Sequence, residues 1–120
     1  MIETGKKQEK VILVAAATEE IEKVERSLDE LGELVKTAGA EVCGRMIQAR
    51  DMIHTGTYIG SGKVGELKEL CAAGEVSLVV FDSELSPAQI KNLEDDLGGD
   101  VTVIDRSMLI LDIFALHALT

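Results

Sequence analysis

A glycine-rich segment is the first part of the chain whose residue types could bind a ligand. It reads Gly56-Thr57-Tyr58-Ile59-Gly60-Ser61-Gly62-Lys63-Val64. A phosphate-binding loop for nucleoside triphosphates needs a glycine five residues before the glycine of its Gly-Lys pair, and a Ser or Thr after the lysine to hold magnesium. Those positions are Thr57 and Val64 here, so we do not predict triphosphate binding. Backbone amides at a helix start and Lys63 could hold another anion, such as an RNA phosphate; a flexible turn with a solvated lysine is the alternative.

Three carboxylates, Asp82, Glu84 and Asp105, follow predicted strands and form a second chemical pattern. Converging carboxylates could hold magnesium, as in receiver-like domains. An aspartate after a strand more often caps or interrupts the next element. We therefore predict no metal site. The two histidines, His54 and His117, have no cysteine or carboxylate at catalytic spacing, which favours surface or packing roles.

The charge balance restricts the partners of the domain. Twelve Lys and Arg stand against 22 Asp and Glu, a net charge of -10, so the domain as a whole repels nucleic acid and anionic membranes. Positive charge prevails only between residues 45 and 68. We predict any RNA or anion contact in that stretch, at Arg45, Arg50, Gly60, Gly62, Lys63 and Lys68. With one Tyr, two Phe and no Trp, a base-stacking platform is disfavoured.

Length and composition predict one packed domain. The chain has 120 residues, of which 46% are hydrophobic and 28% charged. No apolar run approaches the ~18 residues needed to cross a bilayer, and the charged start has no apolar signal region, so a cytoplasmic location is expected. Cys43 and Cys71 lack the spacing of a disulfide framework or a zinc site, and we interpret both as buried small hydrophobic residues.

Apolar runs and helical periodicities alternate along the chain. Strands are predicted over 11–17, 41–50, 76–81 and 101–104, the second an edge strand with a bulge or close approach at Gly44. The helix signals are an N-cap at Thr18, a complete capping box at Ser86, Pro87 and Gln89, and a cap at Ser107. The apolar stripes of the first three helices are Ile21, Val24, Leu28, Leu31 and Val35; Val64, Leu67, Leu70 and Cys71; and Ile90, Leu93 and Leu97.

This alternation predicts an α/β fold in three layers. The expected sheet has four mainly parallel strands in the flavodoxin-like order 2-1-3-4, with helices on both faces. Residues 1–10 are expected to form a flexible extension, and residues 11–120 a single domain. Ligands of such sheets bind beyond the carboxyl ends of the strands.

Three blocks carry a resemblance that covers most of the chain from Val11 onward. They are the glycine-rich segment; Phe81-Asp82-Ser83-Glu84-Leu85-Ser86-Pro87-Ala88-Gln89 with Asn92-Leu93-Glu94; and Val103-Ile104-Asp105-Arg106 with Leu109-Ile110-Leu111-Asp112-Ile113-Phe114-Ala115. In this order and spacing they resemble the N-terminal domain of HflX-type ribosome-associated GTPases. The resemblance makes Asp82, Glu84, Ser86, Pro87, Asp105 and Arg106 family signature positions without an assigned chemical role.

The resemblance implies a longer protein in which this domain precedes a helical subdomain and a GTPase domain that acts on the large ribosomal subunit. GTP and magnesium are then expected in the GTPase domain, and no cofactor in this chain. The sequence after Ala115 departs from the family pattern of Gln-Arg-Ala followed by Arg-Thr-x-Glu-Gly, which leaves open whether the chain end is a truncation or an altered terminus. We therefore expect a non-catalytic domain that helps ribosome binding and regulation of the GTPase.

Two alternatives remain open at this stage. One is an enzyme domain that binds a nucleotide or small anion at its strand-end loops, with Lys63, Asp82 and Asp105 around the substrate. The other is a self-associating regulatory module. A helix expected over 107–119 is apolar nearly all round, and Ile110 and Phe114 would point away from the sheet toward a partner, which in this fragment would be a second copy.

Overall fold

The computed structural model describes residues 8–17, 20–49 and 56–118, with side chains described as far as residue 113. Strands and helices alternate along the chain. The elements are β1 (Lys10–Ala17), α1 (Ile21–Thr37), β2 (Glu41–Ala49), α2 (Ser61–Gly74), β3 (Leu78–Phe81), α3 (Pro87–Asp96), β4 (Thr102–Asp105) and α4 (Arg106–Ala118).

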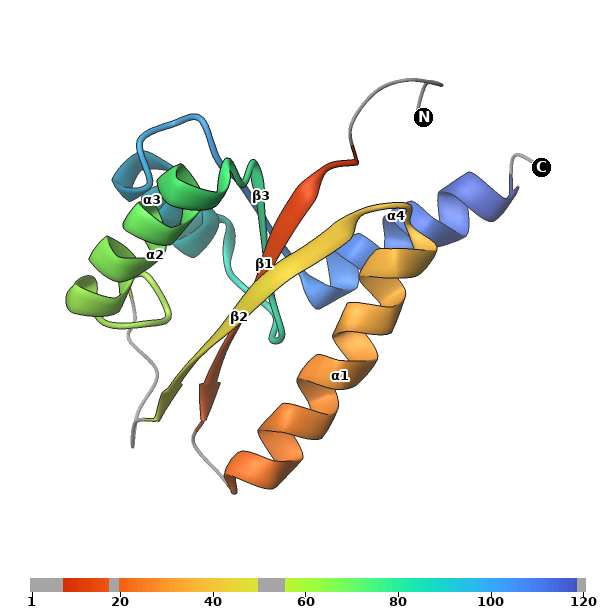
Figure 1. The fold of residues 1–120 in the computed structure, drawn as a ribbon, viewed down its shortest axis with the longest axis horizontal. Helices are drawn as coiled ribbons and strands as arrows, with labels where there is room; N and C mark the ends of the chain where they lie inside the picture. Colours follow the sequence, from red (N-terminus) through yellow and green to blue (C-terminus); the bar gives the residue numbers. More distant parts are fainter. Residues whose placement is uncertain (1–7, 18–19, 50–55, 119–120) are drawn as a thin grey trace.

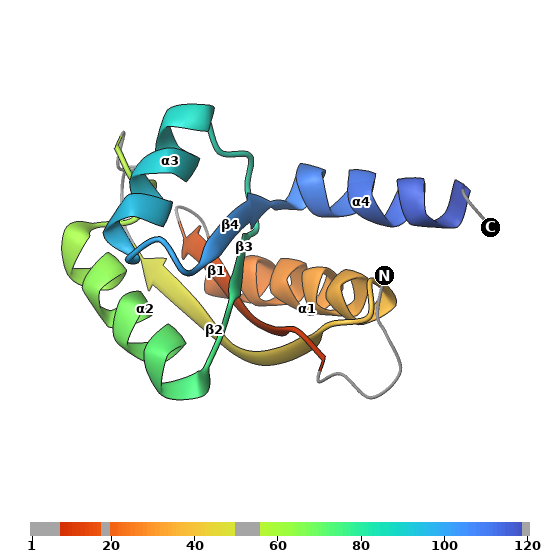
Figure 2. The same cartoon turned by 90° about the horizontal axis from the view of Figure 1, so that it is seen from above.

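The four strands form one parallel sheet in the order β2-β1-β3-β4, which confirms the predicted fold class and strand order (Figure 1). Helices α1 and α4 cover one face, and α2 and α3 cover the other (Figure 2). The result is a three-layer molecule of 42 × 29 × 24 Å. No helix among the described residues is long and apolar enough to cross a membrane.

The continuous apolar run of β1 is explained by cover on both faces of the central strand. Ile12 and Val14 belong to the core beneath α2 and α3, whereas Val11 and Leu13 belong to the core beneath α1 and α4. Successive strand side chains point to opposite faces, so a strand that is covered twice has no polar face.

Helix α1 begins later than its capping signals predict. Its N-cap is Glu20, which makes no side-chain capping bond, and Thr18 lies outside the described residues. Most of the predicted apolar stripe is buried, at Val24, Leu28, Leu31 and Val35. Ile21 is 44% exposed instead, because the first turn of the helix lies beyond the ends of the strands (Figure 1).

Strand β2 is the predicted edge strand, and its pairing with β1 shifts at Cys43. Val11 pairs with Val42 but Ile12 pairs with Gly44, so Cys43 is an extra residue next to the predicted position. The interpretation of both cysteines as buried is wrong for Cys43, which is exposed on this edge. Cys71 is buried as predicted, and its burial raises the pKa of the thiol.

The remaining helices differ from the prediction mainly at their ends. Helix α2 begins at Ser61, inside the glycine-rich segment, and Leu70 of its predicted stripe is 48% exposed, since it lies on the outer side toward β2. Helix α3 has the predicted capping box at Ser86 and Gln89. Gly98 follows it with a φ of +97°, a conformation that favours glycine and ends the helix.

Candidate functional site

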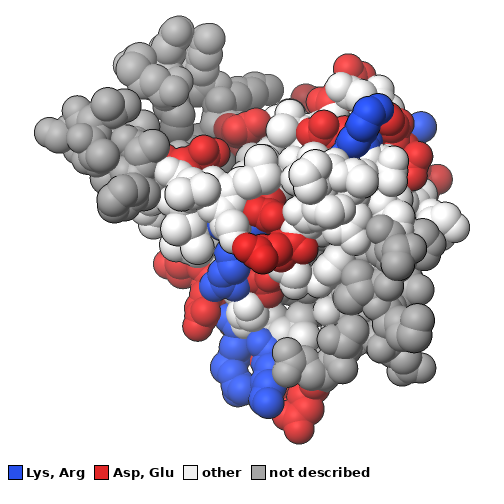
Figure 3. Space-filling view, turned by 180° about the vertical axis from the view of Figure 1, so that it is seen from behind, with Lys and Arg blue, Asp and Glu red and all other residues white. Residues whose placement is uncertain are grey.

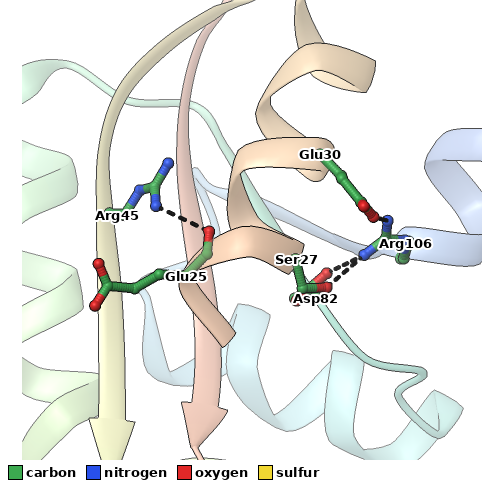
Figure 4. Close-up of polar contacts among 6 residues, drawn as sticks. All are labelled: Glu25, Ser27, Glu30, Arg45, Asp82 and Arg106. Carbon is green, nitrogen blue, oxygen red and sulfur yellow. Dashed lines mark hydrogen bonds and ion pairs between the residues drawn. The ribbon is translucent and has the colours of Figure 1, made fainter. Parts of the chain in front are cut away.

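The carboxyl ends of β1 and β3 meet where doubly wound sheets usually bind ligands, because the strand order reverses between them. In this chain an ion-pair cluster lies close to this point, where it joins the carboxyl ends of β3 and β4 to α1 (Figure 4). Arg106, the first residue of α4, directs Nη1 to Oδ1 of Asp82 at 2.5 Å and to Oγ of Ser27 at 2.9 Å. Its Nη2 lies 3.3 Å from Oε1 of Glu30. We name these four residues the Arg106 cluster.

Burial makes the Asp82 contact the strongest in the Arg106 cluster. The side chain of Asp82 is 7% exposed and that of Arg106 27%, whereas Glu30 is 73% exposed, so solvent screens its contact most. A buried carboxylate needs a partner, and the guanidinium supplies one together with a hydrogen bond. Asp82 is therefore engaged within the protein.

Asp105 ties α4 to the loop after β3. Its side chain is buried, and Oδ1 accepts a hydrogen bond of 3.0 Å from the backbone amide of Met108, which makes Asp105 the N-cap of α4. Oδ2 accepts a second bond of 2.8 Å from the amide of Leu85. The predicted cap at Ser107 is wrong, because that residue lies inside the helix and its hydroxyl donates to Glu84 at 3.3 Å.

These contacts give the strand-end carboxylates structural partners. Asp82 binds an arginine, Asp105 caps a helix, and Glu84 accepts from Ser107. Among the described residues, no three His, Cys, Asp or Glu side chains form a group that could hold a metal ion. The arrangement therefore joins β3, α1 and α4.

The glycine-rich segment is packed into the core. Thr57, Tyr58 and Ile59 are buried, and the Tyr58 ring meets that of Phe81 edge to face at 5.8 Å between centroids. The amide of Ile59 donates to the Thr57 carbonyl at 2.7 Å, which closes a tight turn with Tyr58 at a φ of +70°. The amide of Gly60 donates to Oε1 of Gln48 at 2.8 Å. This part of the segment therefore closes on the protein's own groups.

The predicted basic surface does not form one patch. Arg45 pairs with Leu13 in the sheet, and its guanidinium lies on the α1 face, 2.8 Å from Asp29. The guanidinium also lies 3.4 Å from the carbonyl of Glu25, the contact drawn in Figure 4. Lys63 and Lys68 belong to α2 on the opposite face.

On the α2 face, Lys63 lies 3.4 Å from Glu66, and the Lys68 stem lies against Gly98. Gly62 is exposed in the first turn of α2, after the N-cap Gly60. Arg50 and His54 fall outside the described residues. Gly60, Gly62 and Lys63 therefore lie together at the start of α2, Lys68 lies one turn further along this helix, and Arg45 lies on the opposite face of the sheet.

Other contacts explain the second block of the family resemblance. Asn92 donates from Nδ2 to the Gly56 carbonyl at 3.0 Å, which fixes the glycine-rich segment against α3. Glu94 accepts at 2.9 Å from the amide of Val103 on the edge strand β4. Sequence reasoning assigned no role to these side chains, nor to Ser27, Glu30 or Gln48. Asn92 and Glu94 could have been found, because they belong to the second block of the family resemblance.

The outer face of α4 is apolar and exposed, as predicted for Ile110. The exposed fractions are 37% for Met108, 45% for Ile110 and 65% for Leu111, whereas Leu109 is buried against the sheet. The side chain of Phe114 lies outside the described part, and so do those of His117 and Leu116. Ile110 is therefore exposed, and a docking surface on this face stays a prediction.

Comparisons with known proteins agree with the resemblance. Residues 25–115 match the family model described as GTP-binding GTPase N-terminal. A GTPase HflX from Lacrimispora saccharolytica is 51% identical over 120 residues, which covers 100% of this chain and 28% of the relative. A GTPase HflX from Escherichia coli is 43% identical over 93 residues, or 78% of this chain and 21% of the relative. The chain thus spans about a quarter of the length of these curated relatives.

Solved structures support the fold. The SsGBP and GDP complex superposes with a TM-score of 0.67 at 24% identity, over 92% of this chain and 30% of that chain. A GTP-binding protein from Sulfolobus solfataricus in complex with GDP gives a TM-score of 0.62 at 24% identity, over 91% of this chain and 31% of that chain. By the family model and the curated relatives, this chain belongs to the HflX GTPase family, in which it is the N-terminal domain.

Proposed function

We propose that this chain is a non-catalytic recognition domain of an HflX-type GTP-binding protein. It helps to place that protein on the large ribosomal subunit and to regulate its GTPase domain, in the cytoplasm. The family relationship supports this function, because the relatives are named as GTPases and are about four times longer. GTP and magnesium then bind in the GTPase domain, and the partners in cis are the GTPase and helical domains.

The observation that carries the non-catalytic role is the closure of the glycine-rich segment on itself. The amides of Ile59 and Gly60 bond within the domain, and Thr57 and Val64 replace the glycine and hydroxyl that a triphosphate loop needs. The rival enzyme reading needs free carboxylates at the strand ends. Asp82 and Asp105 already have partners there, so no described contact favours that reading.

The RNA-facing part of this proposal is α2, with Gly60, Gly62 and Lys63 at its start and Lys68 in its second turn. Helix N-termini attract phosphate through their amides and the helix dipole, and the two lysines add charge on the same helix. The acidic remainder disfavours unspecific RNA binding, and Figure 3 shows acidic side chains spread across one side of the molecule.

We expect the isolated chain neither to bind GTP tightly nor to hydrolyse it. Calorimetric titration with GTP and magnesium should give no binding heat at concentrations that saturate a full GTPase. Lys63→Ala should change nothing in this experiment. Magnesium-dependent turnover by the pure chain that is lost in Lys63→Ala would refute the non-catalytic role.

Ribosome contact by the chain should be weak and sensitive to salt. Each neutralised phosphate adds roughly 0.7 to 0.9 to the slope of log K against log salt, and only a few basic residues are available. In sedimentation with large ribosomal subunits, Lys63→Glu and Lys68→Glu should each weaken binding. Each should also reduce the salt slope by about the value for one phosphate contact. Arg50→Glu is expected to act in the same direction.

Two variants serve as controls for the binding face. Arg45→Glu alters the opposite face of the sheet, and Lys91→Glu alters an exposed lysine of α3, so both should act less than Lys63→Glu. A larger effect from charge reversal of Glu22 and Glu25 on α1 would show that the binding face is misassigned.

A further inference from the structure

Three consecutive residues hold the start of α4, each through a different contact. Asp105 binds the amides of Leu85 and Met108, and Ser107 donates to Glu84. Arg106 reaches the end of β3 at Asp82 and the middle of α1. The first turn of α4 is therefore fixed to the loop after β3 and to α1.

Arg106 connects α4 both to the end of β3 and to α1. The side-chain hydrogen bonds described for Asp105 and Ser107 reach the β3–α3 loop and α4, whereas the guanidinium reaches Ser27 and Glu30 on α1. The planar group of an arginine can present several donors in fixed directions, which a lysine cannot do. Contacts to two elements fix both the position of the first turn of α4 and the angle between α4 and α1.

Beyond the first turn, the described side chains of α4 pack on the sheet through Leu109 and Ile113. Leu109 is buried and Ile113 is partly buried, but a hollow of about 220 Å³ lies beside them. Apolar side chains form most of its lining, from the end of α1, from the sheet and from α4. The helix then runs past the sheet, as Figure 2 shows, with Met108, Ile110 and Leu111 exposed on its outer side.

We propose that Arg106 is a positioning residue that sets the direction in which α4 leaves the domain, and that α4 pivots about its first turn when this arginine is lost. The hollow beside Leu109 and Ile113 leaves room for the movement. At 1.5 Å per residue the helix is about 20 Å long, so a turn of about 15° moves its far end by roughly 5 Å. In longer relatives, the part of the chain that follows α4 would move together with the far end of this helix.

Distance measurements between spin labels test this pivot on the chain itself. Labels go on Lys91→Cys in α3 and Leu111→Cys in α4, two exposed positions. Cys43 is changed to Ser, and Cys71 stays because its burial and raised pKa keep the thiol unreactive. With Arg106 present we expect one narrow distance distribution. Arg106→Ala should at least double its width or shift its mean by several ångströms, while circular dichroism shows an intact fold.

Arg106→Lys and Arg45→Ala separate positioning from a general loss of structure. Arg106→Lys retains the charge without the forked donors, so we expect intermediate broadening. Arg45→Ala removes the other arginine contact to α1 and should leave the distribution unchanged. If Arg106→Ala does not fold, the distance distribution of Arg106→Lys tests the proposal in its place. An unchanged distribution in a folded Arg106 variant, or equal broadening in Arg45→Ala, overturns the proposal.

Discussion

Asp105→Ala should destabilise the domain by about 2 to 4 kcal/mol, because it removes a buried carboxylate that holds two backbone amides. The carboxylate is 5% exposed and accepts the amides of Leu85 and Met108. Removal of an N-cap costs about 0.5 to 2 kcal/mol, and a buried donor without a partner costs about 1 to 3 kcal/mol. Urea unfolding followed by circular dichroism measures the difference, and the denaturant slope should not change.

Asp105→Asn and Asp95→Ala are the matched comparisons for this prediction. The asparagine oxygen can still cap α4 at Met108, but its amide group faces the amide of Leu85, so we expect about half of the alanine cost. Asp95 is exposed and forms a surface ion pair with Lys91, so Asp95→Ala should change stability by less than about 0.5 kcal/mol. A cost for Asp105→Ala as small as that for Asp95→Ala would contradict the assigned role.

The order of elements and the sheet topology could be predicted because their signals are local. A run covered on both faces, such as 11–17, and a capping box at Ser86 need only neighbouring residues to be recognised. Short connections between alternating strands and helices then leave few topologies. Helix starts depend on contacts beyond the neighbouring residues. Both Thr18 and Ser107 have the chemistry of a cap, yet Glu20 and Asp105 occupy the cap positions.

The Arg106 cluster could not be predicted, because its members are far apart in the sequence. Arg106 and Ser27 are separated by 79 positions, and Arg106 and Asp82 by 24. The sequence shows that Asp82 and Arg106 follow strands, which places them at one edge of the sheet. It does not show that α1 brings Ser27 and Glu30 to the same point, because that depends on how the helix crosses the sheet.

The predicted basic stretch illustrates a second limit. Residues 45 to 68 are rich in basic side chains, but β2 is an edge strand with an irregularity at Cys43, and α2 crosses the other face. The face on which Arg45 lies depends on this register. Charge density along a sequence therefore did not translate into charge density on one surface.

The apolar outer face of α4 should drive self-association of the chain. Ile110 and Leu111 are 45% and 65% exposed on a helix whose other side packs on the sheet. Full burial of one such side chain gains about 1.5 to 3 kcal/mol, so two or three of them gain several kcal/mol before the entropy of association is subtracted. We expect the chain to form a dimer or higher oligomer through α4, with Ile110 and Phe114 in the contact.

Analytical ultracentrifugation over a range of concentrations measures this association. Ile110→Glu or Phe114→Glu should yield monomer with an intact circular dichroism spectrum, because a charge at the contact would lose its solvation. Leu70→Glu is the matched control, since Leu70 is 48% exposed on α2 across the sheet from α4 and should leave association unchanged. Wild-type chain that stays monomeric at high concentration would mean that two exposed apolar side chains do not offset the entropy of association. If Leu70→Glu dissociated the oligomer as fully as Ile110→Glu does, the contact would not be specific to α4.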